Sequence, residues 1–190
     1  MARALIVVDV QNDFCPGGAL AVNEGDRIIP PINRLIPSFD RIVYTRDWHP
    51  QDHISFSNQP QFVDRSWPVH CLAGTAGAAF HPDLTVHPQG VIVDKGTDKD
   101  EEAYSGFQGT DLAARLRAEG IETVYIAGLA TDYCVKFTAL DAIRAGFKVY
   151  LLTDACRGVD VPTGSVERAV AEMKANGVQT TPSDEVLKDE

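Results

Sequence analysis

The sequence predicts an α/β fold with a mostly parallel central sheet and helices on both faces of that sheet. Short apolar runs rich in β-branched residues alternate with segments of helical periodicity, and this alternation is typical of a parallel sheet covered by helices. The chain has 190 residues, of which 44% are hydrophobic and 23% are charged, as in an ordinary globular domain. We therefore expect residues 1–190 to form one domain.

Five apolar runs are predicted to be the strands of this sheet, because each is short, rich in Val, Ile, Leu or Tyr, and bounded by polar or turn-forming residues. In chain order they are Ala4–Val10, Arg41–Thr45, Val91–Asp94, Thr123–Ala127 and Val149–Thr153.

The helices are predicted from apolar residues that recur three or four positions apart. A first helix includes Pro30 and Pro31, which must lie in its first turn or separate it from a preceding turn. In a second helix, Leu112 and Leu116 lie four residues apart before Gly120. A glycine just after the last periodic residue is a common helix end.

Two more helices follow in the second half of the chain. The stripe over residues 135–143 ends at Gly146, which again indicates a glycine cap. The last predicted helix begins at Pro162 behind Asp160 and ends at Gly177. Its expected buried side chains are Val166, Ala169, Val170 and Met173.

The charge of the chain argues against polyanionic partners. Its formal net charge is -10, so it would repel phosphate backbones and anionic lipid surfaces. The N-terminal apolar stretch Ala4–Val8 is too short for a transmembrane span and lacks a signal-type cleavage region. We expect a cytoplasmic protein with a small-molecule ligand, no nucleic-acid partner and no membrane partner. The sequence leaves its oligomeric state open.

The four cysteines are spread along the chain without a CxxC pair. Such a pattern indicates reduced thiols rather than a disulfide framework. They are Cys15, Cys71, Cys134 and Cys156.

Three reactive side chains fall at predicted strand ends, which face the ligand crevice in open α/β sheets. Asp9 closes the first strand, Lys95 follows the third, and Cys134 lies after the fourth, near the start of a helix. Taken alone, each residue has an ordinary structural explanation: Asp9 as a turn cap, Lys95 as a surface charge and Cys134 as a packed thiol. Together they indicate a nucleophile, because a helix N-terminus and a nearby ammonium both stabilise a thiolate. Asp9 then supplies a base.

A second cluster lies in the long irregular segment 47–88, which is rich in His, Trp, Pro and Gly. Asp47 and His49 are two residues apart, so in an extended chain their side chains point the same way. His70 completes a set of one carboxylate and two imidazoles, with His53 nearby. Such ligands favour one divalent ion, zinc, iron or manganese, and residue types do not choose among these metals. A purely structural histidine cluster is the alternative.

Five segments together resemble the bacterial nicotinamidases, also called pyrazinamidases, of the isochorismatase-like hydrolases. The resemblance covers essentially the whole chain, and the first segment alone marks only the superfamily. The segments are Val8-Asp9-Val10-Gln11-Asn12-Asp13-Phe14-Cys15, Arg46-Asp47-Trp48-His49-Pro50, Trp67-Pro68-Val69-His70-Cys71, Ala103-Tyr104-Ser105-Gly106-Phe107 and Gly128-Leu129-Ala130-Thr131-Asp132-Tyr133-Cys134-Val135.

The resemblance implies roles for individual residues. The implied catalytic triad is Asp9, Lys95 and Cys134. The implied metal ligands are Asp47, His49 and His70, with His53 matching a fourth histidine that some members associate with the metal and that could instead face substrate or water.

The resemblance also implies a pocket and an oxyanion hole. A cis peptide between Leu129 and Ala130 is implied, with the N–H groups of Ala130 and Cys134 directed at one point. Aromatic residues at Phe14, Trp67 and Tyr104 match positions that line the pocket, although Phe14 has core packing as its alternative. Tyr133 stands where some relatives carry histidine, so we expect it to shape the substrate pocket. The acidic segment 96–102 is a predicted loop, and the sequence does not place it relative to the pocket.

The implied activity is hydrolysis of nicotinamide to nicotinate and ammonia through a cysteine thioester, with pyrazinamide as a further expected substrate. One alternative is another amide hydrolase or an isochorismatase of the same superfamily. Isochorismatase-like members lack the cysteine, and carbamoyl amidases generally lack the metal residues, whereas this chain has both. Another alternative is a non-catalytic metal or redox-sensing protein with an oxidised Cys134.

Overall fold

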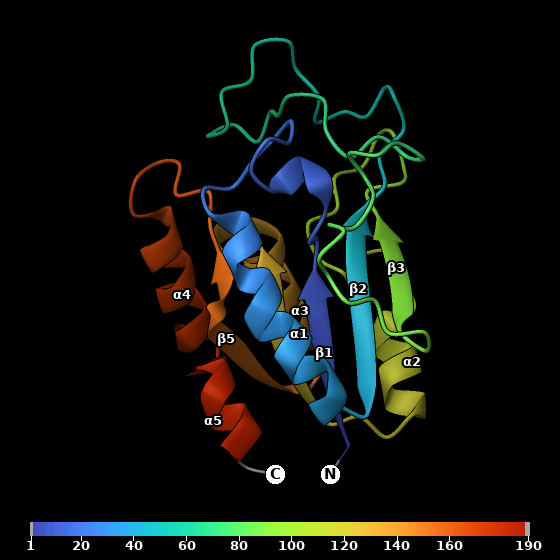
Figure 1. Ribbon diagram of the computed structural model, residues 1–190. Helices are drawn as coiled ribbons and strands as arrows, with labels where there is room; N and C mark the ends of the chain where they lie inside the picture. The colour runs from blue at the N-terminus through green and yellow to red at the C-terminus, as the bar shows by residue number, and fades with distance from the viewer. Residues whose placement is uncertain (1, 189–190) are drawn as a thin grey trace.

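A six-stranded parallel sheet forms the middle layer of the protein (Figure 1), whose structure, a computed structural model, describes residues 2–188. Within this part of the chain the strand order is β3-β2-β1-β4-β5-β6, and every neighbouring pair is parallel. The strands are β1 (Arg3–Val8), β2 (Arg41–Asp47), β3 (Val91–Lys95), β4 (Thr123–Leu129), β5 (Lys148–Arg157) and β6 (Gln179–Thr181).

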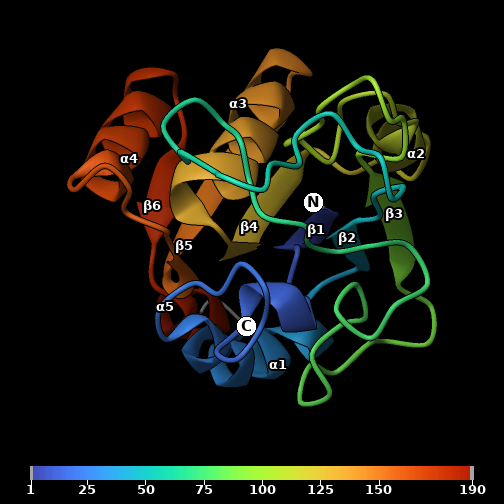
Figure 2. The same ribbon diagram turned by 90° about the horizontal axis from the view of Figure 1, so that it is seen from above.

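Helices cover both faces of the sheet, as Figure 2 shows from above. On one face lie α1 (Ile29–Leu35) and α5 (Ser183–Lys188), and on the other lie α2 (Leu112–Ala118), α3 (Lys136–Arg144) and α4 (Ser165–Ala175). In β1, Ile6 packs with the α2, α3 and α4 core, while Leu5 and Val7 pack with the α1 core. A strand buried on both faces reads as a continuous apolar run. The predicted fold class is confirmed, and the sheet is entirely parallel where described.

All five predicted strands are present, but their ends differ from the sequence prediction. The first ends at Val8 instead of Val10, because Asp9 takes a positive φ of 50° and turns the chain out of the sheet. The second and third extend to Asp47 and Lys95. The fourth and fifth are also longer than predicted. Strand β6 and helix α5 were not predicted. Strand β6 is only three residues long and polar, so it has no apolar run to indicate it.

The last predicted helix was wrong at its start, since α4 begins at Ser165 instead of Pro162. The Asp160 carboxylate accepts hydrogen bonds from the N–H groups of Gly164 (3.0 Å) and Val166 (3.2 Å). It therefore caps a turn that includes Pro162, and the helix starts only after that turn. Ala169 and Met173 are buried as predicted, whereas Val166 and Val170 are half-buried.

The first helix combines the two arrangements that its prolines allow. A 3₁₀ turn at Gly25–Ile28 precedes α1, and Pro30 and Pro31 lie in the first turn of α1. There the missing N–H groups of proline cost no helical hydrogen bond.

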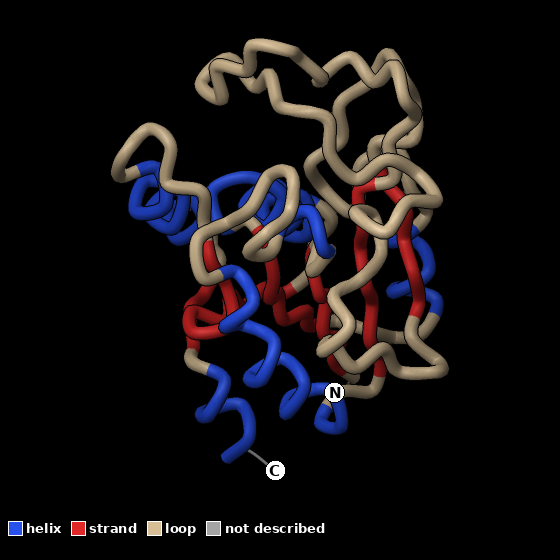
Figure 3. The backbone as a smooth tube through the Cα atoms, turned by 45° about the horizontal axis from the view of Figure 1, so that its top comes forward, coloured by secondary structure: helices blue, strands red, loops and turns tan. Residues whose placement is uncertain are grey.

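The long segment between β2 and β3 rises above the carboxyl ends of the strands (Figure 1). Figure 3 shows it as loop throughout, and isolated β-bridges such as His49 with Leu72 and Phe56 with Trp67 tie it together. The first part of the irregular segment predicted at 47–88 is thus placed over the edge where strand-end side chains meet. The chain then runs back along the sheet to the start of β2, where the Arg41 side chain donates to the Gln89 carbonyl at 3.1 Å.

All four cysteines are buried and free. None of the helices within residues 2–188 has both the length and the apolar character that a membrane crossing requires.

Candidate active site

Lys95 is the centre of the charged cluster at the carboxyl edge of the sheet. Its Nζ lies 2.8 Å from Asp9 Oδ2, 2.5 Å from Asp47 Oδ1 and 3.3 Å from Cys134 Sγ. The four side chains come from the ends of β1, β3 and β2 and from the π-helical turn Thr131–Val135 after β4. The structure therefore brings the three predicted triad residues together and joins them to the predicted metal ligand Asp47.

Asp9 is positioned to accept a proton. Its Oδ1 accepts a hydrogen bond from Thr45 Oγ1 at 2.8 Å. Its Oδ2 forms an ion pair with Lys95 but lacks the alignment of a hydrogen bond. Burial raises the pKa of Asp9 against the opposing effect of the Lys95 ammonium. A carboxyl group that has a raised pKa and one oxygen without a hydrogen bond can both take up and return a proton.

The thiol of Cys134 has a perturbed pKa. Burial raises the pKa of its thiol well above the usual value and outweighs the lowering effect of Lys95, while the Asp9 carboxylate raises the pKa further. The raised pKa keeps the proton on Cys134 at rest, as a mechanism in which Asp9 removes that proton requires. An adjacent base must remove its proton before it can attack.

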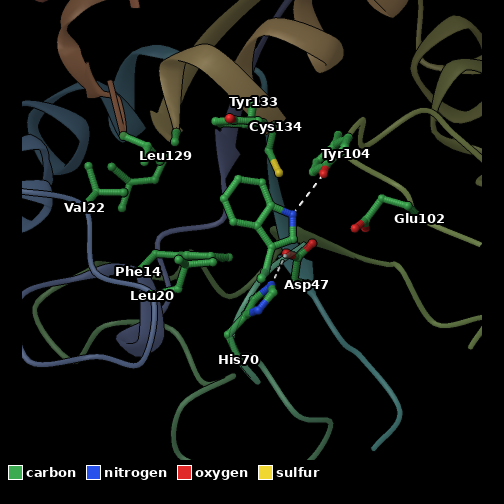
Figure 4. Close-up of a pocket in the computed structure, with 13 residues that line it drawn as sticks. Phe14, Leu20, Val22, Asp47, His70, Glu102, Tyr104, Leu129, Tyr133 and Cys134 are labelled. Carbon is green, nitrogen blue, oxygen red and sulfur yellow. Dashed lines mark hydrogen bonds and ion pairs between the residues drawn. The ribbon is translucent and has the colours of Figure 1, made fainter. Parts of the chain in front are cut away.

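Asp47, His49 and His70 point ligand atoms at one another. Asp47 Oδ2 lies 3.3 Å from His49 Nε2 and 3.7 Å from His70 Nε2, and Figure 4 shows the His70 ring directed at Asp47. The other ring nitrogens bond to backbone carbonyls, His49 Nδ1 to Gly96 at 2.8 Å and His70 Nδ1 to Pro68 at 2.7 Å. A carbonyl accepts only an N–H, so in the neutral ring, the form that binds a metal, each Nε2 keeps a free lone pair.

These three residues fit a divalent ion. Ligands about 2.0–2.1 Å from a metal lie about 2.9–3.4 Å from one another, close to the separations from Asp47 Oδ2. The Lys95 ammonium and His49 overcome the effect of burial and hold the pKa of Asp47 well below its usual range. Asp47 is therefore a carboxylate, with one oxygen on Lys95 and the other facing the two histidines.

His53 lies beside this group, with its ring centroid 4.1 Å from that of His49. Its Nδ1 is 2.8 Å from Ser55 Oγ, and its Nε2 is 3.1 Å from the Glu101 carbonyl oxygen. The structure therefore brings His53 next to the three-residue set with both of its nitrogens bonded elsewhere. Its role as a fourth ligand stays a prediction.

A pocket of about 430 Å³, including its open mouth, lies over the sulfur of Cys134 (Figure 4). The four aromatic residues predicted for substrate binding all line the pocket, namely Phe14, Trp67, Tyr104 and Tyr133. Apolar side chains and the polar residues Asp47, His70 and Glu102 complete its lining.

The aromatic rings support one another around this pocket. Trp67 Nε1 donates a hydrogen bond to the Tyr104 hydroxyl at 3.0 Å, and the Trp67 and Tyr133 rings meet edge to face at 4.9 Å. Phe14 packs 5.5 Å from His70. The rings form apolar walls suited to a flat heteroaromatic ligand.

The predicted cis peptide between Leu129 and Ala130 is present. The Ala130 carbonyl accepts hydrogen bonds from the N–H groups of Tyr133 (3.0 Å) and Val135 (3.1 Å). Ala130 and Cys134 both line the pocket, and their joint role as an oxyanion hole stays a prediction.

Sequence reasoning missed several residues that support the site. Gln11 is fully buried; its Nε2 donates to the Asp47 carbonyl, and its Oε1 accepts from the Asp47 N–H, both at 2.8 Å. Asp13 Oδ2 accepts from the N–H of Cys71 at 2.8 Å, next to His70. The sequence signal for Gln11 and Asp13 was that both belong to the first motif. Their bonding partners lie 36 and 58 residues away along the chain.

Comparisons with known proteins agree along nearly the whole chain. A family model described as the isochorismatase domain matches residues 3–185. The chain is 45% identical over 202 residues to the nicotinamidase of Acinetobacter baylyi, with 97% of this chain and 94% of the relative covered.

Solved structures are also similar to this chain over nearly its whole length. The pyrazinamidase of Pyrococcus horikoshii in complex with zinc is 50% identical, with a TM-score of 0.86 and 96% of this chain and 99% of that chain covered. PnC1 from L. infantum in complex with nicotinate is 36% identical, with a TM-score of 0.86 and coverage of 96% and 93%. The similarity therefore extends from sequence to fold.

Proposed function

The chain belongs to the isochorismatase family, and from that premise we propose that it hydrolyses nicotinamide to nicotinate and ammonia and also acts on pyrazinamide. The enzyme class is amide hydrolysis at the carboxamide C–N bond. Nicotinamidase relatives and their similar structures support this activity.

One observation is central to the proposal. A thiol, a buried carboxylate and an ammonium lie together beside an Asp-His-His set. Cys134, Asp47 and His70 from this cluster line a pocket with aromatic walls. The thiol cluster accounts for cleavage of an acyl C–N bond. The aromatic walls account for a planar ring as the substrate body.

In the first half of the reaction Asp9 takes the proton from Cys134, and the sulfur attacks the carboxamide carbon. Lys95, 3.3 Å from the sulfur and 2.8 Å from Asp9, stabilises the thiolate as it forms. The N–H groups of Ala130 and Cys134 receive the negative charge on the carbonyl oxygen, an effect worth about 3–4 kcal/mol per donor. Protonated Asp9 then gives its proton to the leaving ammonia.

In the second half a nicotinoyl thioester on Cys134 is hydrolysed. Asp9, again ionised, takes a proton from an incoming water, which attacks the thioester carbon. The C–S bond breaks, the sulfur recovers a proton, and nicotinate leaves. One carboxyl group thus acts as base and acid in turn, as the raised pKa of Asp9 allows.

Asp47, His49 and His70 would hold the divalent ion, and zinc, iron and manganese all suit this set. When bound, the ion supplies a Lewis-acid contact for the pyridine nitrogen and orients the ring. Trp67 and Phe14 flank the same ring, and Gln11 keeps Asp47 in place.

The remaining expectations are proposals of the same kind. Residues 1–190 form one domain, which the family match over residues 3–185 supports. Four free cysteines support a reducing compartment, so the cytoplasm stays the predicted location.

The test is ammonia release from nicotinamide and pyrazinamide by purified protein, with metal analysis of the same sample and Cys134→Ala as the control. We expect release from both amides by the wild-type protein and none from the control. Release only from an N-carbamoyl substrate would assign the chain to another hydrolase of the family. No release from any amide by metal-loaded protein would favour a metal or redox-sensing role.

A further inference from the structure

Glu102 is an acidic side chain on the wall of the pocket that the mechanism above does not use. It is half-buried and lines the same cavity as Cys134 and Trp67 (Figure 4). Its Oε1 accepts a hydrogen bond from the N–H of Ala103 at 3.1 Å, and its backbone carbonyl accepts one from Gln108 at 3.0 Å. The side chain is therefore held at the pocket by its own loop.

The charge of Glu102 is not neutralised in the way that the charge of Asp47 is. Asp47 has the Lys95 ammonium at 2.5 Å, whereas Glu102 has no direct ion pair within residues 2–188, and one ring nitrogen each of His49 and His53 lies within 4.8 Å of its carboxylate. The guanidinium of Arg65, on the neighbouring loop, lies against the Tyr104 ring at 5.7 Å instead. A half-buried carboxylate without a direct ion pair projects a negative field into the cavity, and any positive charge on His49 or His53 offsets part of that field.

We propose that Glu102 is a specificity-determining residue that disfavours anionic ligands in the pocket and thereby favours the neutral amide over the carboxylate product. The proposal rests on the function proposed above, because that reaction converts an uncharged carboxamide into an anion of nearly the same shape. The rings of the pocket cannot tell the two apart by size. A fixed like charge can, because it raises the free energy of the bound anion and leaves that of the neutral ligand almost unchanged.

The charge-neutral substitution Glu102→Gln isolates this effect, since glutamine keeps the length of the side chain and an oxygen for the Ala103 N–H. Removing one like charge near a bound anion at a partly exposed site changes affinity by about tenfold. We therefore expect the ratio of Ki for nicotinate to KM for nicotinamide to fall by about tenfold in Glu102→Gln. Raising the salt concentration should narrow the difference between the two proteins.

The matched control is Glu101→Gln, which removes the same charge one residue earlier from an exposed side chain that does not line the pocket. It should leave the ratio within twofold of wild type. Pyridine-3-methanol, an uncharged ligand without an acyl group, is the control for pocket shape, and its Ki should be the same in wild type and Glu102→Gln. Metal content is measured for all three proteins.

Three results would overturn the proposal: an unchanged ratio, a parallel change in Ki for nicotinate and pyridine-3-methanol, or loss of metal in Glu102→Gln. The second would assign Glu102 to pocket shape, and the third would assign it to the metal ligands. Turnover of nicotinamide by the wild-type protein is measured first, so failure of the proposed function is seen separately from failure of this charge effect.

Discussion

Replacing Asp9 with asparagine removes one negative charge beside Cys134 and keeps the shape of the side chain. The amide oxygen can face the Lys95 ammonium, which lies 2.8 Å from Asp9 Oδ2. The amide nitrogen can then face the hydroxyl oxygen of Thr45, which is 2.8 Å from the other carboxylate oxygen. Asp47 still neutralises Lys95 at 2.5 Å. The variant should fold, and its defects should be chemical.

Asp9→Asn should have two effects: it should slow turnover, and it should make the Cys134 thiol easier to ionise. Without a base, turnover should fall by at least about a hundredfold. The Cys134 pKa should fall as well, because the Asp9 carboxylate raises it in the wild-type protein. A carboxylate oxygen of Asp9 and the sulfur lie within 4.8 Å of each other. Two like charges at that distance repel by about 3 kcal/mol at an effective dielectric constant of about 20, which corresponds to about a hundredfold in the thiolate-to-thiol ratio.

The assay pairs ammonia release with the rate of Cys134 alkylation by iodoacetamide, measured by mass spectrometry across a pH series. Cys134→Ala supplies the background from the other three cysteines. In Asp9→Asn the alkylation profile should move to lower pH while ammonia release is lost. An alkylation profile at the same or a higher pH would refute the electrostatic argument, and turnover within tenfold of wild type would refute the role of Asp9 as base.

Cys134→Ala should abolish ammonia release and retain the metal, whereas Cys156→Ala should keep most activity, because Cys156 lies outside the charged cluster and does not line the pocket. A loss of activity in the second variant would argue against this assignment. His49→Ala and His70→Ala should each lower metal content and turnover in parallel, while Cys134 alkylation stays near normal; metal-free protein with full turnover would contradict this coupling. Gln11→Leu should lower the free energy of unfolding by about 2–4 kcal/mol, since two buried backbone groups of Asp47 lose their partners, and should also weaken metal binding; urea denaturation and metal titration measure both, and an unchanged midpoint would show that those groups find other partners.

Much of the site was accessible from sequence because its residues are fixed by short-range geometry. Asp47 and His49 are two residues apart at the end of an extended strand, so their side chains must share a face. Asp9 and Lys95 follow or end parallel strands, whose carboxyl ends meet at one edge. His70 had no such local argument; it was included because it lies in the same His-rich segment, and the resemblance supported that choice.

Glu102 shows what sequence reasoning could not reach. The segment 96–102 has no strand or helix period, so nothing in it predicts which side chain turns towards the pocket. Glu101 and Glu102 are identical in type and adjacent in sequence, yet one is exposed and the other lines the cavity. The bonds that hold the loop connect it to His53 and Gln108 and depend on the assembled fold.

The sequence by itself determined the α/β class, the five longer strands, and the residue types of the nucleophile, base and metal ligands, because periodicity and short spacing are local properties of the chain. Only the tertiary structure decided the protonation of Cys134, the sharing of Lys95 between Asp9 and Asp47, and the ring nitrogens that face the metal site. Each of these depends on burial or on partners tens of residues away. A pKa is set by the solvent excluded and the charges gathered around a group, and both come into existence only when distant segments pack together.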